Sequence, residues 1–291
     1  MKPTFDFDAG LLDNAAAFRD PFFQRFRLRR APRPLQLTEQ IAKDYLFPTL
    51  YANVKCAIGI FLCDYEAARA LLPHPAMRPV RMTLGRSLVV FSCYEYRNVL
   101  GVPPYNEVAM TIPVLVNAPV DLPVVPMVVP GFPGFGYYVF GMPVTSRENQ
   151  LRGNKIWGLP KVTQEIDLYE EGGDCVTTVR DEAGEAYCSL RVPVAGKRAQ
   201  FDVRAHLYSS LGGRLLQSET CFRATFAVNG HMGLLARRDA TPDREYLTLG
   251  SGPAASTLRA LGIERQPFQL RYASSMNSAF DLPDPEYRVA R

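Results

Sequence analysis

Lysine, histidine and tryptophan are scarce in this chain of 291 residues, and their scarcity limits the chemistry that it can carry. The three histidines are not at metal-binding spacings, and the cysteines form no Cys-x-x-Cys motif. A zinc or other transition-metal site therefore has no recognisable ligand set. Because nucleotide and phosphate motifs are missing as well, the sequence predicts a protein without a cofactor.

Long apolar runs are also missing, so no membrane-spanning helix is predicted. The most apolar stretch, residues 124–140, is interrupted by Pro126, Pro130 and Pro133 and is typical of a loop leading into a strand. The N-terminus lacks an apolar secretion segment, and the six cysteines are scattered. Together these features predict reduced thiols and a cytoplasmic location.

Apart from a basic and aromatic run at residues 22–33, charge of one sign is not concentrated along the chain. The formal net charge is +4, and lysines and arginines are spread along the sequence. Nucleic-acid-binding domains usually carry a clustered basic patch, so we expect no nucleic-acid partner.

What the sequence has in abundance is strand-like segments. These cover residues 51–61, 88–96, 108–116, 162–169, 175–180, 187–194, 222–228 and 268–275. Asp64 is placed to cap a short helix at residues 65–72, which Pro73 ends. Many short strands with few helices predict a mainly β fold, either a barrel or a sandwich. No linker divides residues 51–291, so we expect one β domain after an N-terminal extension, residues 1–50, that is helical or irregular.

The most informative segment is residues 153–162, Gly-Asn-Lys-Ile-Trp-Gly-Leu-Pro-Lys-Val, which holds two of the six lysines. Gly158 and Pro160 restrict the backbone and direct Lys161 at the start of a strand. The neighbouring side chains are apolar, and if they enclose Lys161 its pKa falls, leaving a neutral amine that can attack a carbonyl. Alternatively, Lys161 is an ordinary solvated lysine, since strand alternation places it on a polar face that looks onto either solvent or a barrel interior.

This segment resembles the lysine-bearing signature of the acetoacetate decarboxylase family. Three further stretches resemble family segments and occur in the same order along the chain as in the family. They are residues 56–73, the Tyr105-Asn106-Glu107 segment, and the serine-rich residues 273–281. The resemblance implies a closed antiparallel β-barrel or cone with a few flanking helices, in which Lys161 forms a Schiff base with a keto acid and Glu107 transfers protons or orients the substrate. It also implies a homo-oligomer that needs no cofactor.

Three positions depart from the family pattern. The second lysine that follows the reactive one in the family is Val162 here. Counting without gaps, the family's arginine falls on Val54 and one of its glutamates on Ser92, while Lys55 is expected to point to the opposite face of its strand. Burial alone can lower a lysine pKa by about three to five units, so Schiff-base chemistry survives these changes if the site is dry.

The substrate stays open at this point. Decarboxylation of a β-keto acid is the first hypothesis, and an aldolase-dehydratase acting on pyruvate and an aldehyde is a close variant. The rival is a non-catalytic barrel that binds an apolar or keto-bearing small molecule. Candidates for contact with a substrate carboxylate are Arg81, Arg97 and Arg271, and candidate hydrogen-bond donors are Tyr94, Tyr105 and Tyr272.

Overall fold

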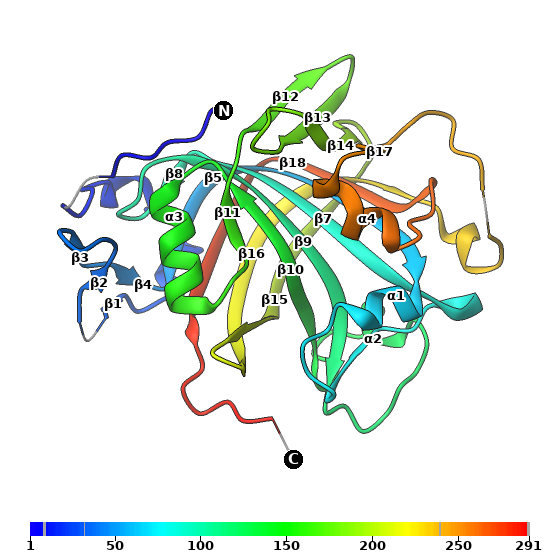
Figure 1. Ribbon diagram of the computed structural model, residues 1–291, viewed down its shortest axis with the longest axis horizontal. Helices are drawn as coiled ribbons and strands as arrows, with labels where there is room; N and C mark the ends of the chain where they lie inside the picture. The colour runs from blue at the N-terminus through cyan, green and yellow to red at the C-terminus, as the bar shows by residue number, and fades with distance from the viewer. Residues whose placement is uncertain (8–9, 32, 239, 290–291) are drawn as a thin grey trace.

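The expected mainly β fold is confirmed by the computed structural model, which describes residues 1–7, 10–31, 33–238 and 240–289. Seven long strands form a closed barrel in the order β10, β15, β16, β18, β5, β7 and β9, and β9 pairs with β10 to complete it (Figure 1). Their bounds are β5 (Thr49–Asp64), β7 (Arg86–Tyr96), β9 (Tyr105–Val116), β10 (Phe135–Val144), β15 (Lys197–Leu211), β16 (Arg214–Gly230) and β18 (Pro267–Pro283).

An odd number of strands prevents this barrel from being antiparallel throughout. If strand directions alternate around a closed barrel, the last strand is antiparallel to the first only when the number of strands is even. With seven strands, at least one pairing has to be parallel. That pairing is β10 with β15, where Tyr137 lies beside Leu207 and Tyr138 beside Tyr208. The other pairings around the ring are antiparallel. The barrel is therefore mixed, which corrects the antiparallel arrangement that the sequence led us to expect.

Shorter elements surround the barrel. The strands β11 (Lys161–Thr163), β6 (Met77–Pro79) and β8 (Asn98–Val99) pair with barrel strands, and β12 (Ile166–Glu171), β13 (Asp174–Arg180), β14 (Ala186–Pro193) and β17 (Leu247–Leu249) form a separate sheet. The N-terminal arm contains β1 (Arg29–Arg30), β2 (Leu35–Gln36), β3 (Ala42–Lys43) and β4 (Leu46–Phe47). The α-helices are α1 (Tyr65–Ala70), α2 (Val125–Val128), α3 (Arg147–Arg152) and α4 (Ser256–Ala260). A π-helical turn spans Gly153–Trp157, and 3-10 turns span Ala15–Ala17, Phe23–Arg25, Thr83–Gly85, Met232–Leu235 and Pro253–Ala255.

The helix predicted after Asp64 is confirmed, whereas one barrel strand was missed. The Asp64 carboxylate accepts a hydrogen bond from the Ala67 amide at 2.8 Å and caps α1. No strand was predicted at β15, although Phe201 and Val203 alternate there with polar residues as a strand with one face on a barrel interior requires.

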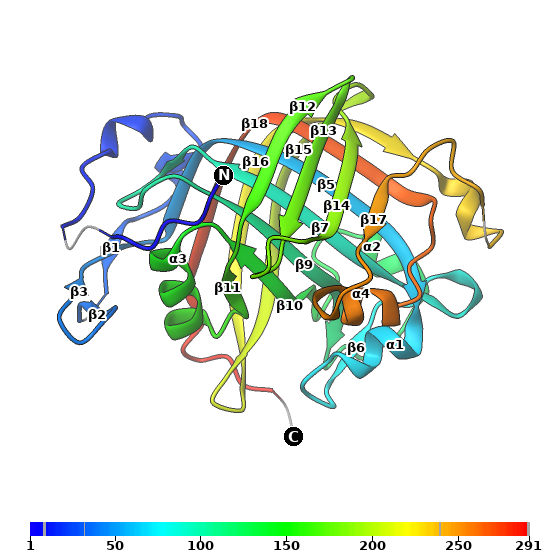
Figure 2. The same cartoon turned by 45° about the horizontal axis from the view of Figure 1, so that its top comes forward.

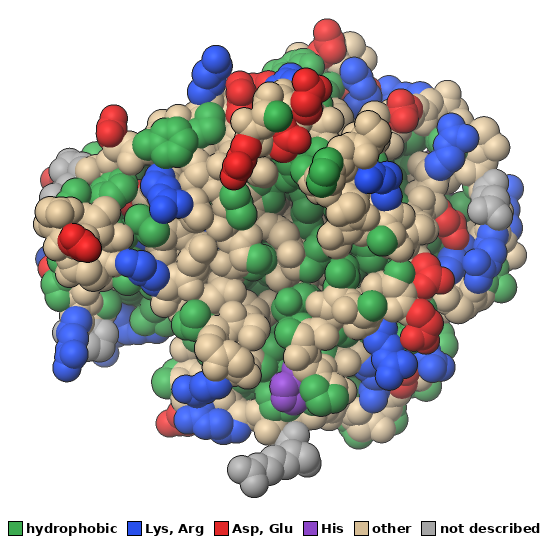
Figure 3. Space-filling view, viewed as in Figure 1, with side chains coloured by type: hydrophobic (Ala, Val, Ile, Leu, Met, Phe, Trp, Pro, Cys, Tyr) green, Lys and Arg blue, Asp and Glu red, His purple; other side chains and the backbone are tan. Residues whose placement is uncertain are grey.

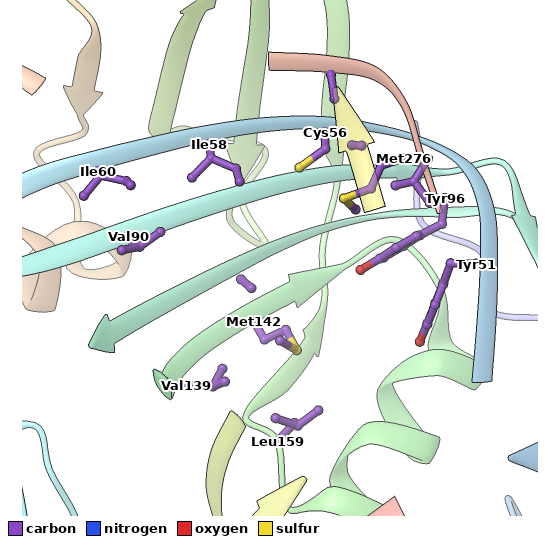
Figure 4. Packing of buried hydrophobic residues seen from close by; sticks show 14 of the residues in the cluster. Tyr51, Cys56, Ile58, Ile60, Val90, Tyr96, Val139, Met142, Leu159 and Met276 are labelled. Carbon is purple, nitrogen blue, oxygen red and sulfur yellow. The ribbon is translucent and has the colours of Figure 1, made fainter. Parts of the chain in front are cut away.

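Alternate residues of each barrel strand point inward and form the interior core. On β5 these include Cys56, Ile58 and Ile60, which Figure 4 shows projecting into the same interior as Val90 and Tyr96 of β7. The two-residue period of a strand places the intervening side chains on the outer face.

The outer face of β5, β7 and β9 is covered by the separate sheet. Figure 2 shows β12, β13, β14 and β17 lying across these strands. Phe61 and Phe91 of the barrel are fully buried there with an edge-to-face contact at 6.0 Å, and they belong to one cluster with Ile166 and Leu190 of the covering sheet. The barrel wall is thus packed on both sides, which fixes its curvature and its strand register.

The N-terminal arm is docked on the barrel rather than extended into solvent. Phe22 and Phe23 are buried against Leu50 and Cys221 on its outer surface. The division at residue 50 stays a prediction, but part of the arm is integral to the packing.

The surface shown in Figure 3 carries charges of both signs. Lys and Arg side chains are spread around this face, and acidic side chains gather over the β12–β13 end, where Glu170 and Glu171 are exposed. None of the helices in the described part of the chain is long and apolar enough to cross a membrane.

Phe61→Ala is expected to lower the free energy of unfolding by about 3–5 kcal/mol, because it leaves a cavity between the barrel and the covering sheet. Urea unfolding measures this loss. Phe5→Ala is the control, since Phe5 is 64% exposed and its removal leaves no cavity. An equal effect of the two substitutions would contradict the packing described here.

Candidate active site

Lys161 begins β11 and is held at the edge of the barrel by its connection to α3. The chain passes from α3 into the π-helical turn Gly153–Trp157, reverses at Gly158 and enters β11, which runs parallel to β10 with Lys161 beside Met142. Lys161 is only 6% exposed, whereas Val162 is 44% exposed. The polar face of this strand therefore looks inward, and the lysine is not a solvated one.

Two glycines make this geometry possible. A Cβ atom at Gly153 would lie 2.4 Å from Cδ of Lys161, so only glycine lets the helix turn pass this close to the lysine. Gly158 has φ of 60°, and a Cβ atom there would lie 2.3 Å from the Ser210 carbonyl oxygen. The two glycines thus place the turn between the lysine side chain and the β15 backbone.

Trp157 fastens the same turn to the barrel. Its indole nitrogen donates a hydrogen bond to the Asp281 carbonyl at 2.8 Å, and its ring stacks on Phe280 at 5.0 Å. The Ser209 hydroxyl donates to the Trp157 carbonyl at 2.5 Å. Contacts to both β15 and β18 therefore restrain the segment that carries Lys161.

The Lys161 amine contacts a carboxylate and an amide. Its Nζ donates to Oε2 of Glu107 at 2.6 Å and to Oδ1 of Asn149 at 2.7 Å. It also lies 5.7 Å from the centre of the Tyr105 ring. Glu107 comes from β9 and Asn149 from α3, so residues from three elements meet at this nitrogen.

Burial and neighbouring charges oppose each other at this amine. Burial has the largest effect and lowers the pKa of Lys161 below its ordinary value of 10.5, since an ammonium is poorly stabilised away from water. Glu107 raises the pKa by stabilising the charged form, and Arg152 lowers it by repulsion. The net shift is downward, toward the neutral amine.

Tyrosines enclose the pair. The Tyr96 hydroxyl donates to Oε1 of Glu107 at 3.3 Å, and the Tyr96 ring contacts those of Tyr51, Tyr94 and Tyr105 with centroids 4.5 to 5.1 Å apart. Figure 4 shows the Tyr51 and Tyr96 rings side by side. Burial raises the pKa of Tyr94, Tyr96 and Tyr105, so all three stay protonated and can donate hydrogen bonds.

A buried arginine, Arg152, lies on the same helix as Asn149. It is 1% exposed, donates to the Thr49 hydroxyl at 3.1 Å and stacks on the Tyr45 ring at 4.3 Å. Among the described residues no carboxylate forms an ion pair with it, and its Nε and the Asn149 Nδ2 are buried without hydrogen-bond partners. The helix thus offers unused hydrogen-bond donors near the lysine.

The N-terminal arm holds this helix in place. Lys43 of β3 forms an ion pair with Oε1 of Glu148 at 2.9 Å, with side chains 0% and 2% exposed, and the Tyr45 hydroxyl donates to the same oxygen at 2.8 Å. Because Glu148 precedes Asn149 in α3, the arm bears directly on the position of the amide that contacts Lys161.

The structure brings together both residues that the sequence put forward as catalytic, Lys161 and Glu107. Val54 faces the interior, while Lys55 pairs with Glu170 at 3.0 Å on the outer face, which confirms the predicted opposition of these two neighbours. Arg81 pairs with Asp121 away from the site.

The tyrosines and the remaining arginines that the sequence suggested as substrate contacts lie in different parts of the barrel. Tyr94 and Tyr105 belong to the tyrosine group around the pair, whereas the Tyr272 hydroxyl donates to Glu170. Arg97 pairs with Glu95, and Arg271 faces the barrel interior without an ion-pair partner among the described residues.

Asn149, Arg152 and Lys43 were not identified from the sequence. Ser146 caps α3 by accepting a hydrogen bond from the Asn149 amide at 3.2 Å, which is a recognisable helix-start signal. The three-residue spacing of Asn149 and Arg152 then places them on one helix face. For Lys43 no local signal exists, because its partner is 105 residues away.

Comparisons with known proteins agree on one family. A sequence profile of acetoacetate decarboxylase matches residues 32–273. Curated protein sequences gave no match.

Solved structures show the same fold. The acetoacetate decarboxylase of Legionella pneumophila subsp. pneumophila str. Philadelphia 1 shares 14% identity over 81% of this chain and 86% of its own, with a TM-score of 0.54. The enduracididine biosynthesis enzyme MppR, complexed with pyruvate, shares 12% sequence identity over 81% of this chain and 88% of its own, also with a TM-score of 0.54. An acetoacetate decarboxylase-like enzyme from Sphingomonas wittichii RW1 shares 14% sequence identity over 91% of this chain and 96% of its own, with a TM-score of 0.50.

Gly153→Ala is expected to lower the free energy of unfolding by about 1–3 kcal/mol, because the added methyl group overpacks the site and displaces the Lys161 side chain. Chemical unfolding measures the change. Gly233→Ala is the matched control, since a methyl group there meets open space. Equal stabilities of the two variants would show that the helix turn and the lysine are not in close contact.

Lys43→Met is expected to cost about 3–5 kcal/mol of stability, because it leaves the Glu148 carboxylate buried and unpaired. Adding Glu148→Leu should recover part of that loss by removing the stranded charge. Lys155→Met serves as the control, since Lys155 is exposed and bonds only backbone carbonyls of the arm. If the double variant is less stable than Lys43→Met, the ion pair does not account for the effect.

Proposed function

The chain belongs to the acetoacetate decarboxylase family, and from this premise we propose that it is a cofactor-independent lyase in which Lys161 forms a Schiff base with a keto acid. The observation that carries the proposal is the Lys161 amine itself, which is buried, has a lowered pKa and lies 2.6 Å from a carboxylate that can take up its proton. A neutral, oriented amine is the nucleophile that this reaction needs.

The proposed reaction begins when Lys161 transfers a proton to Glu107. The neutral nitrogen adds to the keto carbon, and water leaves to give a protonated C=N bond. In a β-keto acid, the electrons of the bond to the carboxyl carbon then move into this C=N bond, so that carbon dioxide leaves and an enamine remains. Protonation of the enamine carbon and hydrolysis release the ketone and restore Lys161.

Glu107 is suited to move the protons in these steps. Its Oε2 already accepts from Lys161, and its Oε1 accepts from Tyr96, so the carboxylate is oriented on both sides. A carboxylate within hydrogen-bond distance of the reacting nitrogen can act as base in one step and return the proton in a later one.

Arg152 and Asn149 are the proposed contacts for the substrate's polar ends. Arg152 is buried without a carboxylate partner among the described residues, so binding a keto acid would supply the missing negative charge. The free Asn149 Nδ2 can donate to the carbonyl oxygen or to the developing hydroxyl. Arg152 also repels the Lys161 ammonium, which partly replaces the cation that the family carries where this chain has Val162.

The same amine supports a close variant, in which pyruvate forms the Schiff base and the derived enamine attacks an aldehyde. The complex of MppR with pyruvate motivates this variant. Comparing acetoacetate with pyruvate plus aldehyde by product analysis separates the two reactions.

Borohydride treatment with acetoacetate or pyruvate is expected to fix a covalent adduct on the peptide that contains Lys161, detected by mass spectrometry. Lys161→Met should lose the adduct completely, whereas Lys155→Met, altered in the same segment, should keep it. If folded wild-type protein yields no adduct with a panel of keto acids but still binds them, the non-catalytic barrel is the better description.

The rate of adduct formation is expected to rise with pH, with a midpoint below 10.5, because the neutral amine is the reactive form and its pKa is lowered. In Glu107→Gln the ammonium loses its stabilising negative charge, so the pKa of Lys161 falls further and the midpoint moves to lower pH. Trapping rates measured from pH 5 to 10 on both proteins test this direction. A shift to higher pH would show that Glu107 does not stabilise the ammonium.

A further inference from the structure

A second uncompensated cation, Arg271 of β18, faces the interior of the barrel. It lies directly beside Ile58 of β5 and Val228 of β16 in the strand register. Side chains of directly opposite residues project to the same face of a sheet, and Ile58 points into the barrel (Figure 4). Val228 packs against the same interior cluster.

The surroundings of Arg271 leave its charge unbalanced. Its Nε donates to Oε1 of Gln269 at 2.5 Å, and its guanidinium lies 4.7 Å from the centre of the Phe201 ring. Burial lowers the pKa of Arg271, while Tyr137 acts in the opposite direction. Hydrogen bonding and ring contact orient the group, but neither supplies a negative charge.

Arg271 is partly buried, and most fully buried cations of this protein have a carboxylate partner. Lys43 pairs with Glu148, Arg86 with Glu264 at 2.9 Å, and Lys161 with Glu107. In the described part of the chain, Arg152 and Arg271 have no such partner. Removing a charge from water is costly unless an opposite charge accompanies it. Two arginines without carboxylate partners, one buried on α3 and one partly buried on the barrel wall, therefore favour a ligand with two negative groups.

We propose that Arg271, together with Gln269 and Phe201, forms a subsite for a second carboxylate at the far end of the substrate, so that the substrate is a keto diacid. The Arg271 guanidinium can bind a planar carboxylate through two parallel hydrogen bonds, and the Gln269 amide can donate a further one. The Phe201 ring can pack against the carbon chain of the substrate. This inference rests on the proposed Schiff-base function for the keto end of the same molecule.

The strand order places the subsite apart from Glu107 along the barrel wall. Across the sheet, Glu107 pairs with Tyr94, and Tyr94 pairs with Cys56. Cys56 lies two residues before Ile58, the partner of Arg271 on β5. Three inter-strand steps of about 4.8 Å separate β9 from β18. Arg271 and Glu107 thus lie on different strands of the wall, so one substrate can meet them with opposite ends.

Borohydride trapping on Lys161 over a range of substrate concentrations tests the subsite with a matched pair, acetoacetate and 3-oxoadipate. Wild-type protein is expected to reach half-maximal trapping at a lower concentration of the diacid. Arg271→Met should raise that concentration roughly 10- to 100-fold for the diacid and leave acetoacetate unchanged, and Arg271→Lys should recover part of the difference. Arg97→Met is the control, because Arg97 pairs with Glu95 outside the subsite.

Calorimetric binding of adipate and pentanoate, which have no keto group, distinguishes the subsite from the covalent chemistry. Tighter binding of adipate that is lost in Arg271→Met supports the subsite even if no adduct forms on Lys161, in which case the proposed function alone fails. Equal effects of Arg271→Met on the mono- and diacid, or no effect on either in a variant that melts like wild type, would overturn the inference.

Discussion

The contact between the Lys161 amine and the Glu107 carboxylate is the interaction on which the rest of this site depends. At 2.6 Å and away from solvent, the pair can exist as two ions or, after proton transfer, as two neutral groups. Its surroundings decide between these states: burial and Arg152 favour the neutral amine, and Glu107 favours the ammonium. Burial has the larger effect, so the amine is held closer to its neutral form than it would be in water.

The second constraint is that α3 reaches the pair from outside the barrel and has to be held there. A helix of six residues is too short to be stable alone. Its position comes from the Ser146 cap, the Lys43–Glu148 ion pair and the stacking of Arg152 on Tyr45. The N-terminal arm, whose role the sequence left open, therefore contributes to the geometry of the site.

The strands around Glu107 and the turn before Lys161 could be predicted because their signals are local: alternating side chains, two glycines and a proline. Family resemblance then brought Lys161 and Glu107 together, although 54 residues separate them. Arg152 and Lys43 were not predictable in this way. Arg152 follows a stretch without strand periodicity, and the value of Lys43 depends on a partner far along the chain. The parallel pairing of β10 and β15 also escaped prediction, since strand patterns carry no direction.

The odd number of strands in the barrel has a consequence for how such a protein can change. Parallel neighbours cannot be joined by a hairpin, so the chain needs a long crossover between β10 and β15. That crossover, residues 145–196, contains α3, the lysine turn and most of the covering sheet. Lys161, the proposed nucleophile, thus lies on a connection rather than on a barrel strand. Changes within this one segment would alter the surroundings of the Lys161 amine, while Glu107 and the register of the barrel strands stay in place.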